Sequence, residues 1–477
     1  PALIPSLRMR IFNTLGRALQ PFEPRDAGKV SMYVCGATVQ SKPHVGHGRY
    51  AVVFDVVRRY LEWLGYEVTY VRNITDVDDK IINAANEMGI TTGEVVEMAD
   101  SAFRWAYEQL KVAPPDIEPR ATEHIPEMIA MIEKLIERGH AYEADGDVYF
   151  IVRSFPEYGK LSGRNIDELQ AGARVEPGEH KRDPLDFALW KAAKPGEPSW
   201  ESPWGPGRPG WHIECSAMSL EYLGLGFDIH AGGHDLVFPH HENEIAQAEA
   251  ANEGATFARY WIHNGMVNLG GEKMAKSTGH IVDLLEALDA YPPMAMRLFY
   301  LRTHYRKPVE FTREAMDDAV ASLERLWAFR RRVPGPVEDV ADDATMGRFQ
   351  AALEDDFDVA GGLGVVFDTV RDGNRLLDSG GEAGPLVAAY DEMVGVLGLL
   401  EPTVELGDLA DRIATLATRY DLAIDSAAGD VIADLLAARQ QARADRDWET
   451  ADAIRADLDE LGIAIEDTAD GARWHRR

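Results

Sequence analysis

The chain has 477 residues, of which 45% are hydrophobic, and it carries a formal net charge of −31. A chain of this length is expected to form about two to four domains with buried cores. Its acidity excludes a protein whose whole surface binds nucleic acid, because such binding needs Lys and Arg to replace counterions. The sequence holds no run of about 18 apolar residues to span a bilayer. Its N-terminal segment also lacks a signal-peptide core and cleavage site, so we expect a cytoplasmic protein.

The segment 29–75 predicts a β-α-β unit. Its runs KVSMYVCG and EVTYVRNIT are typical of buried strands, and the helical stretch GRYAVVFDVVRRYLEWLGY lies between them. Strands joined in this way form a parallel sheet, with a crevice at the strand ends where nucleotides usually bind. Residues 122–139 then predict an amphipathic helix. Residues 141–152 predict a hairpin, because Asp145-Gly146 is a strong turn signal between alternating runs.

The rest of the chain changes from mixed to helical patterning. Residues 191–209 are rich in Pro, Gly and Trp and indicate an irregular insertion, whereas 227–244 return to compact α/β patterning. Residues 258–271 predict a pair of strands. From about Val282 onward the pattern is helical, apart from two linker-like segments and a small hairpin predicted over 461–476.

The stretch FPHHENE combines two histidines with two glutamates ahead of a predicted helix. His240 and Glu244 are four residues apart, so they share one helix face as two zinc ligands require. A charged first helical turn would explain the same residues, and by spacing alone His241 could replace His240. Cys35 and Cys215 are too few for a disulfide framework. With a histidine and a glutamate they make a complete tetrahedral set for zinc, although two unrelated buried thiols are the alternative.

Two further stretches suit phosphate binding. In KPHVGHGR, His44 and His47 flank Gly46 just before a predicted helix, whose N-terminus offers free N–H groups to an anion. In GEKMAKSTGH, Lys273 and Lys276 supply two ammonium groups on a short loop, which suits a leaving pyrophosphate. Taken singly, each stretch could also be an ordinary loop, with two unremarkable histidines in one case and a solvated basic turn in the other.

Together these two stretches, about 230 residues apart, resemble the His-x-Gly-His and Lys-Met-Ser-Lys-Ser signatures of class I aminoacyl-tRNA synthetases. More closely, YVCGATVQSKPHVGHGR, RNITDVDDKI, GWHIECSAM, FPHHENEIAQ and EKMAKS are similar to motifs of cysteinyl-tRNA synthetases. The resemblance runs from roughly Arg10 to Trp474. One departure is Ala275, where the signature usually has serine; because both lysines are kept, it affects only a minor hydroxyl contact.

The resemblance implies an α/β fold with a Rossmann-like, parallel-sheet catalytic domain over 1–318 that carries an insertion at about 127–210. An all-α tRNA-binding region would follow over 319–425, and a small C-terminal anticodon-binding domain over 426–477.

The resemblance also implies the reaction. L-cysteine would attack the α-phosphate of Mg-ATP to give cysteinyl-adenylate, and the cysteine would then pass to the 3′ end of tRNA(Cys), with the enzyme acting as a monomer. One Zn²⁺ per chain, held by Cys35, Cys215, His240 and Glu244, would select the substrate thiolate. Shape alone would reject serine poorly, because small side-chain differences are worth only about 1–3 kcal/mol. For ATP, the resemblance implies contacts from His44, Gly46, His47, Lys273 and Lys276. It assigns catalysis to the two histidines and the two lysines of this set. For the substrate, it implies contacts from Cys35, Gly36, Thr75, Trp211 and His230.

By the same resemblance, the stretch RADRDWETADAIRADL reads the anticodon. Trp448 and Asp452 recur at helical spacing with Arg455, and Arg443 comes a turn earlier. An aromatic ring can stack on an unpaired base and a carboxylate can accept from a guanine edge. From the residues alone, an amphipathic helix with a buried Trp448 is the favoured explanation of the pattern.

Two rival functions are considered. A cysteine ligase of the same superfamily would join cysteine to a small amino-sugar acceptor, but such ligases stop before the anticodon region. A zinc- and RNA-binding protein without activity is disfavoured, because both phosphate-binding stretches are complete.

Overall fold

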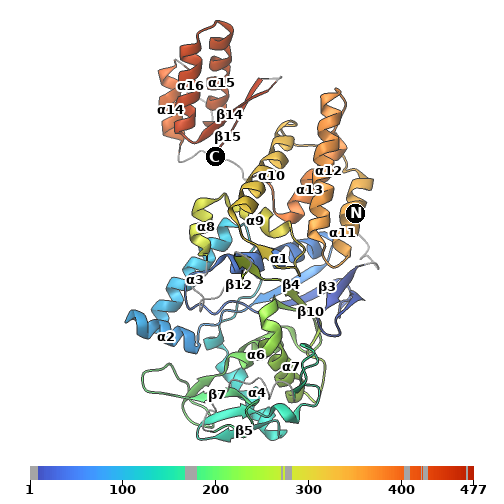
Figure 1. Cartoon of the computed structure of the whole chain (residues 1–477), viewed down its shortest axis with the longest axis vertical. Helices are drawn as coiled ribbons and strands as arrows, with labels where there is room; N and C mark the ends of the chain where they lie inside the picture. Colours follow the sequence, from blue (N-terminus) through green and yellow to red (C-terminus); the bar gives the residue numbers. More distant parts are fainter. Residues whose placement is uncertain are drawn as a thin grey trace. The chain divides into compact units, whose positions relative to one another are not determined.

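The computed structural model describes residues 9–166, 180–269, 272–273, 282–401, 409–420, 422, 428–468 and 471–476. The chain divides into two compact units, 1–400 and 401–477, and Figure 1 labels their elements. Helix α14 (Ala410–Arg419) belongs to the second unit, although the sequence assigned 319–425 to the preceding helical region. The domain boundaries stay a prediction. Among the described residues, no helix has the length and apolar character needed to cross a membrane.

A parallel sheet of four strands, in the order β10-β9-β3-β4, forms the centre of the first unit. This confirms the predicted α/β class and the β-α-β unit, in which α1 (Val45–Trp63) joins β3 to β4. Both faces of the sheet are covered, so its strands read as nearly continuous apolar runs. The strands are β3 (Lys29–Val34), β4 (Glu67–Arg72), β9 (Phe227–Gly233) and β10 (Ala258–Asn264).

The predicted insertion contains an antiparallel sheet in the order β5-β6-β7-β8. The hairpin prediction is confirmed: Asp145 and Gly146 both have positive φ, 53° and 87°, as a tight two-residue turn requires. The irregular reading of 191–209 is wrong at both ends, which belong to paired strands. Trp190 of β7 is opposite Pro209 of β8 and is fully buried, and a Pro- and Gly-rich composition does not reveal this pairing. The strands are β5 (Ala141–Ala144), β6 (Asp147–Phe150), β7 (Phe187–Ala192) and β8 (Gly207–Pro209).

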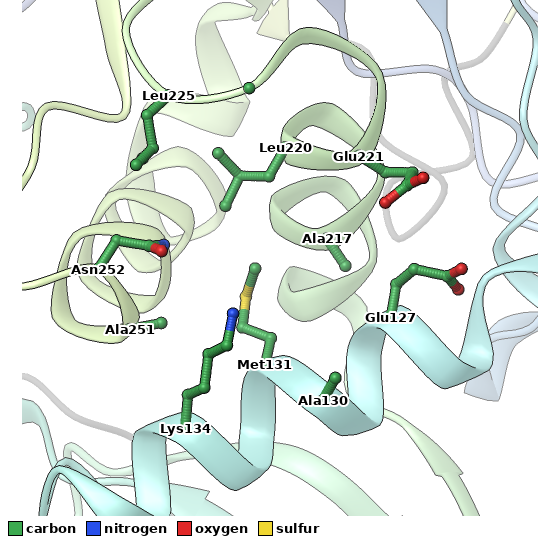
Figure 2. A pocket seen from close by; sticks show the side chains of 11 residues that line it. Glu127, Ala130, Met131, Lys134, Ala217, Leu220, Glu221, Leu225, Ala251 and Asn252 are labelled. Atoms are coloured by element: carbon green, nitrogen blue, oxygen red, sulfur yellow. The ribbon is translucent and has the colours of Figure 1, made fainter.

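Three helices pack together between the two sheets: α4 (Ile125–Glu137), α6 (Trp211–Leu223) and α7 (Glu242–Ala251). They leave a cavity of about 390 Å³. Figure 2 shows Met131 and Lys134 reaching into it from α4, toward Leu220 of α6 and Asn252 just after α7. The cysteine of α6 and the Glu244 of α7 that were predicted as metal ligands are not part of its lining, so this cavity is distinct from the predicted metal group.

The two strands predicted over 258–271 exist, but they do not pair with each other. Strand β10 lies in the parallel sheet, whereas β11 (Val267–Leu269) pairs with β12 (Glu272–Lys273) and β13 (Val309–Glu310). The chain changes direction at Gly265, where an added Cβ would lie 2.5 Å from the carbonyl oxygen of Lys307. This close approach between distant segments has no local sequence pattern.

The remaining elements are mainly helical, as predicted. In the first unit they are β1 (Arg10–Asn13), β2 (Ala18–Pro21), α2 (Asp79–Met88), α3 (Thr92–Gln109), α8 (Leu284–Ala290), α9 (Pro293–Leu301), α10 (Arg313–Arg331), α11 (Asp343–Glu354), α12 (Val359–Asp378) and α13 (Gly384–Leu397). In the second unit α14 packs on α15 (Ala428–Ala444), which packs on α16 (Trp448–Glu460). The predicted terminal hairpin is confirmed as β14 (Ile463–Thr468) and β15 (Gly471–Arg476).

Candidate metal and nucleotide site

The candidate site begins at the carboxyl end of β3. The N–H of Cys35 donates to the carbonyl of Ala231 at 3.0 Å, which fixes Cys35 beside β9. The next residue, Gly36, lies against the end of β4: its N–H donates to Oδ1 of Asn73 at 2.8 Å, and an added Cβ would fall 1.6 Å from the Asn73 carbonyl oxygen. A side chain at Gly36 would therefore force the ends of β3 and β4 apart.

Four predicted ligands, Cys35, Cys215, His240 and Glu244, meet in one buried group. They come from the end of β3, from α6, from the short helix η4 (Val237–His241) that precedes α7, and from α7 itself. Their donor atoms all lie within 4.8 Å of one another. Bonds of about 2.0–2.3 Å to zinc place tetrahedral donors about 3–4 Å apart, so this set of two sulfurs, one imidazole and one carboxylate fits a single ion of that kind.

A second set of donors overlaps the first. Cys35 and Glu244 also lie within 4.8 Å of His230 and His241. The first set contains both thiols, the softest donors available, which favours a thiophilic metal such as zinc. In addition, Nδ1 of His240 lies 2.8 Å from Nδ1 of His212, the kind of outer contact that orients a ligating imidazole. These two observations favour His240 over His241.

The electrostatics of the group favour the charged state that a metal requires. Burial alone would raise the pKa of the Cys215 thiol, but hydrogen bonds with Cys35 and His240 lower that pKa to about 7. Burial likewise opposes charge on Glu244, yet His230 and His240 hold its pKa well below the usual range. Burial raises the pKa of the Cys35 thiol well above its ordinary value. The group therefore offers a cation the carboxylate of Glu244 and the easily ionised thiol of Cys215. The thiol of Cys35 would ionise only when a metal is bound.

Aromatic rings fix the imidazoles around Glu244. Trp211 stacks on His240 with ring centroids 4.2 Å apart, and Trp261 stacks on His230 at 4.3 Å. His230, predicted to line the substrate pocket, is fully buried, and its Nε2 lies 2.8 Å from Oε2 of Glu244. The structure thus brings Trp211 and His230 to the metal group.

A line of polar side chains leads away from Glu244, and hydrogen bonds join all of them except His241 to Glu244. Nε2 of His241 lies 3.9 Å from Oε1 of Glu244, and Nδ1 of His241 lies 2.7 Å from Nε2 of His263. Nδ1 of His263 lies 2.8 Å from the hydroxyl of Thr14. Sequence reasoning missed His263 and Thr14, because they belong to β10 and to the turn after β1, far from the histidine-rich stretch.

Two other neighbours of Cys215 were missed. The amide Oδ1 of Asn73 lies 3.7 Å from the Cys215 sulfur, and the ring of Tyr33 lies 5.4 Å from that of His230. Burial, and then the nearby Cys215 and Cys35 thiols, raise the pKa of Tyr33 well above its ordinary value. Strand alternation could have found Tyr33, which lies two residues before Cys35 on the same face.

Thr75 is buried, and its hydroxyl donates to Oε2 of Glu214 at 3.0 Å, next to Cys215 in the sequence. The helix that follows Thr75 begins after Asp78, which caps α2 by accepting from the N–H of Lys80.

The two histidines of the first phosphate stretch form the N-terminus of α1. The His44 side chain accepts from the N–H of Gly46, and the His47 side chain accepts from the N–H of His44, both at 3.1 Å. The rings stack with centroids 3.8 Å apart. Two imidazoles are thus held at the positive end of a 19-residue helix, where an anion is favoured.

Of the lysine stretch, the structure describes Glu272 and Lys273, and the chain that follows it contacts the start of α1. Lys273 ends β12, which pairs with β11, while Lys276 lies outside the described residues. Where the described chain resumes, the carbonyl of Val282 accepts from the N–H of Val45 at 3.1 Å, and Asp283 forms a β-bridge with His44. The segment after the lysines therefore lies against the start of α1.

The predicted anticodon residues lie in the second unit. Trp448 begins α16 and is 58% exposed, and Asp452 and Arg455 are exposed on the same helix, whereas Ile454 and Leu458 are buried. The alternative of a buried Trp448 is therefore wrong. Arg443 is also exposed but lies on α15, separated from α16 by a turn, so it is not a helical turn before Trp448.

Comparisons with known proteins agree over the whole chain. Family models match at residues 21–321 (tRNA synthetases class I (C) catalytic domain), 348–401 (DALR domain) and 428–474 (cysteinyl-tRNA ligase anticodon binding domain). The chain is 51% identical to the cysteine–tRNA ligase of Alkalilimnicola ehrlichii, over 98% of this chain and 100% of the relative. It is 47% identical to that of Syntrophotalea carbinolica, over 99% and 100%.

Among solved structures, Mycobacterium tuberculosis methionyl-tRNA synthetase in complex with methionyl-adenylate has a TM-score of 0.57 and 16% identity. The match covers 78% of this chain and 90% of that one. At this level of identity the likeness supports the fold.

Proposed function

Because the chain belongs to the cysteine–tRNA ligase family, we propose that it activates L-cysteine with ATP and transfers it to tRNA(Cys), and that its buried Cys/Cys/His/Glu group selects cysteine. The observation that carries this proposal is the convergence of Cys35, Cys215, His240 and Glu244 at the end of β3. A parallel sheet of this type binds ligands at the carboxyl ends of its strands.

The metal proposed for this group is one Zn²⁺ per chain. Zinc would lower the pKa of a substrate thiol and bind the thiolate far better than a serine hydroxyl. The chain's own contribution is to hold the donors in place. Trp211 keeps the His240 ring flat against it, and His230 occupies one oxygen of Glu244, so that the other oxygen faces His240. Gly36 and Thr75 would border the substrate beside Cys35, since both lie where β3 and β4 end.

The nucleotide chemistry is assigned to the start of α1 and the lysine stretch. His44 and His47 would contact the phosphates of Mg-ATP, and Gly46, which lacks a side chain, would let the nucleotide approach the backbone. Lys273 and Lys276 would stabilise the charge that develops on leaving pyrophosphate. Support comes from the hydrogen bond between Val45 and Val282, which brings the chain that follows the lysine stretch to the start of α1. No covalent intermediate with the enzyme is needed.

For recognition of tRNA(Cys), we assign the anticodon contacts to Arg443, Trp448 and Asp452. Their exposure on α15 and α16 supports this assignment. An enzyme with these substrates would act beside translation, in the cytoplasm, and we propose that it does so as a monomer. The alternative, a ligase that joins cysteine to an amino-sugar acceptor, finds no support, because the relatives named cysteine–tRNA ligase match over nearly the full chain.

The test is cysteine-dependent exchange of pyrophosphate into ATP, followed by charging of tRNA(Cys). We expect exchange with cysteine and almost none with serine, and charging only when tRNA(Cys) is added. Exchange that is equally rapid with serine would refute selection by the Cys/Cys/His/Glu group. Exchange without charging would instead favour another acceptor.

A further inference from the structure

Arg49 is a fully buried arginine of α1, two residues after His47. Burial lowers its pKa to about 10, so the guanidinium keeps its charge at neutral pH. In the part of the chain that the structure describes, its hydrogen-bond partners are backbone carbonyls, and no carboxylate pairs with it. A buried charge is costly unless hydrogen bonds compensate it. The partners of Arg49 therefore indicate what this charge is kept for.

The guanidinium of Arg49 joins two segments that are far apart in the sequence. The five carbonyls that it contacts belong to Gly265, Met266, His304, Tyr305 and Lys307. Its Nη1 donates to the first two, at 3.0 and 2.8 Å. Its Nη2 donates to Lys307 at 2.5 Å and reaches the other two at 3.4 Å. A rigid, planar fork can hold two such groups of acceptors at once, which a single ammonium cannot do.

Both segments lead into the three-stranded sheet that carries Lys273. Met266 directly precedes β11, and the second segment precedes β13. The two segments are also bonded to each other, because the N–H of Val309 donates to the carbonyl of Met266 at 3.0 Å. Strand β12, which ends at Lys273, pairs with β11. Arg49 thus holds the base of the sheet in which the lysine stretch begins.

The helix that carries Arg49 also carries the histidines of the candidate nucleotide site. His44 and His47 form the N-terminus of α1, just ahead of Arg49. Between them and Arg49, Gly48 packs against Tyr300 of α9, and an added Cβ at Gly48 would lie 2.7 Å from the Tyr300 hydroxyl. Helix α1 is therefore closely packed at this point. A guanidinium fixed to it can set the position of the sheet relative to the two histidines.

We infer that Arg49 is a positioning residue, which holds β11 and β12, and with them Lys273, at the distance from His44 and His47 that Mg-ATP requires. The inference rests on the ligase function proposed above, in which the histidines and Lys273 contact the phosphates. Arg49 is fully buried and touches no substrate itself. It acts through the backbone of Gly265 and Met266.

The test uses Arg49→Lys, which keeps the charge but replaces the planar fork with one ammonium. The matched control is Arg297→Lys, because Arg297 is also fully buried and also donates to backbone carbonyls, those of Leu110 and Leu397. We expect Arg49→Lys to lower kcat for cysteine-dependent pyrophosphate exchange by about 10²-fold, as for a misplacement of about 1 Å. KM for cysteine should be unchanged, because no contact of Arg49 involves the Cys/Cys/His/Glu group. Arg297→Lys should leave both constants unchanged.

A double variant separates positioning from a general loss of structure. Replacing Lys273 removes a group through which Arg49 acts, so Arg49→Lys should cost much less in a Lys273→Ala protein than in wild type. Losses in the double variant that simply multiply would overturn the inference. A rise in KM for cysteine together with the fall in kcat would also overturn it, because Arg49 would then maintain the whole site.

Folding of each variant is checked by urea unfolding. If Arg49→Lys does not fold, Arg49→Gln is measured in the same way, since its amide keeps two N–H donors without burying a charge. Failure of both variants to fold would overturn the inference, because Arg49 would then serve the fold. If wild-type protein does not exchange pyrophosphate, the proposed ligase function fails and the inference with it. If wild type exchanges and Arg49→Lys equals it, the inference about Arg49 alone fails.

Discussion

Nε2 of His240 lies 3.0 Å from Oε1 of Glu244, while Nε2 of His230 lies 2.8 Å from Oε2 of the same carboxylate. One fully buried carboxylate is thus shared by two imidazoles from different elements. Burial disfavours a charged imidazole at His240, but Glu244 and Cys215 outweigh it and raise the His240 pKa to about 10. A metal ion at this position would replace that proton with a stronger positive charge, which makes the identity of the ligating histidine directly testable.

His240→Ala should reduce bound zinc to well below one ion per chain, whereas His241→Ala should retain it, because His240 belongs to the set with both thiols. Metal analysis of purified protein measures the difference, and His304→Ala serves as a control remote from the group. Retention of zinc in His240→Ala together with its loss in His241→Ala would assign the metal to the second set, with His230 and His241.

A cobalt-substituted protein should change its visible spectrum when cysteine is added and should not respond to serine, because cobalt reports a new sulfur ligand. The expected response needs Cys215, so Cys215→Ser should alter the spectrum before any amino acid is present. An unchanged spectrum on saturation with cysteine would mean that the substrate thiol does not coordinate the metal and that the group is structural.

Lys276→Ala should slow cysteine-dependent pyrophosphate exchange by about 10²-fold, as expected when a donor to developing charge is removed. Cysteine affinity should change little, because the ammonium acts on the leaving group. Lys29→Ala, a lysine 62% exposed on β3, is the matched control. Equal exchange rates in the two variants would remove Lys276 from the mechanism.

Trp448→Ala should lower kcat/KM for charging of tRNA(Cys) by about tenfold, because stacking on a base is worth about 1–3 kcal/mol. Trp105, which is 40% exposed on α3, provides the control substitution Trp105→Ala. Pyrophosphate exchange should be normal in both proteins. If charging by Trp448→Ala equals that of wild type, α16 does not read the anticodon through this ring.

Asp55→Asn should destabilise the first unit at neutral pH and much less in acid. Burial raises the pKa of Asp55, but Arg297 and Arg59 outweigh burial, so that its folded-state pKa lies below 3.8. A depressed carboxyl pKa stabilises the fold above the unfolded-state value, and this stability is lost as pH falls through the folded-state value.

Urea unfolding measures the free energy of unfolding of wild type and of Asp55→Asn. The difference between the two proteins should therefore be smaller at about pH 3 than at about pH 7. At neutral pH we expect this difference to be about 3–5 kcal/mol, which is the cost of breaking a buried ion pair. If the difference in free energy of unfolding is the same at both pH values, Asp55 contributes packing rather than charge.

Local patterns predicted the elements whose signals are local. The Asp145-Gly146 turn and the strands and helix of 29–75 are confirmed, because turn chemistry and apolar runs act over a few residues. The four clustered ligands were also predicted, because the family resemblance singled them out among residues whose types suit zinc. The pairing of β7 with β8 and the separation of β10 from β11 were missed, because both depend on contacts such as that of Gly265 with Lys307.

The hydrogen bonds that join Thr14, His263 and His241 have a direction. Burial holds the pKa values of His241 and His263 well below the ordinary histidine value, so both rings are neutral and each carries one N–H. If the Thr14 hydroxyl donates to His263, then His263 donates to His241, and His241 turns its N–H toward Glu244. If the hydroxyl accepts, both rings adopt the other tautomer, and His241 presents a lone pair to the metal group instead. The orientation of the Thr14 hydroxyl therefore sets whether Nε2 of His241 faces Glu244, 3.9 Å away, with an N–H or with a lone pair.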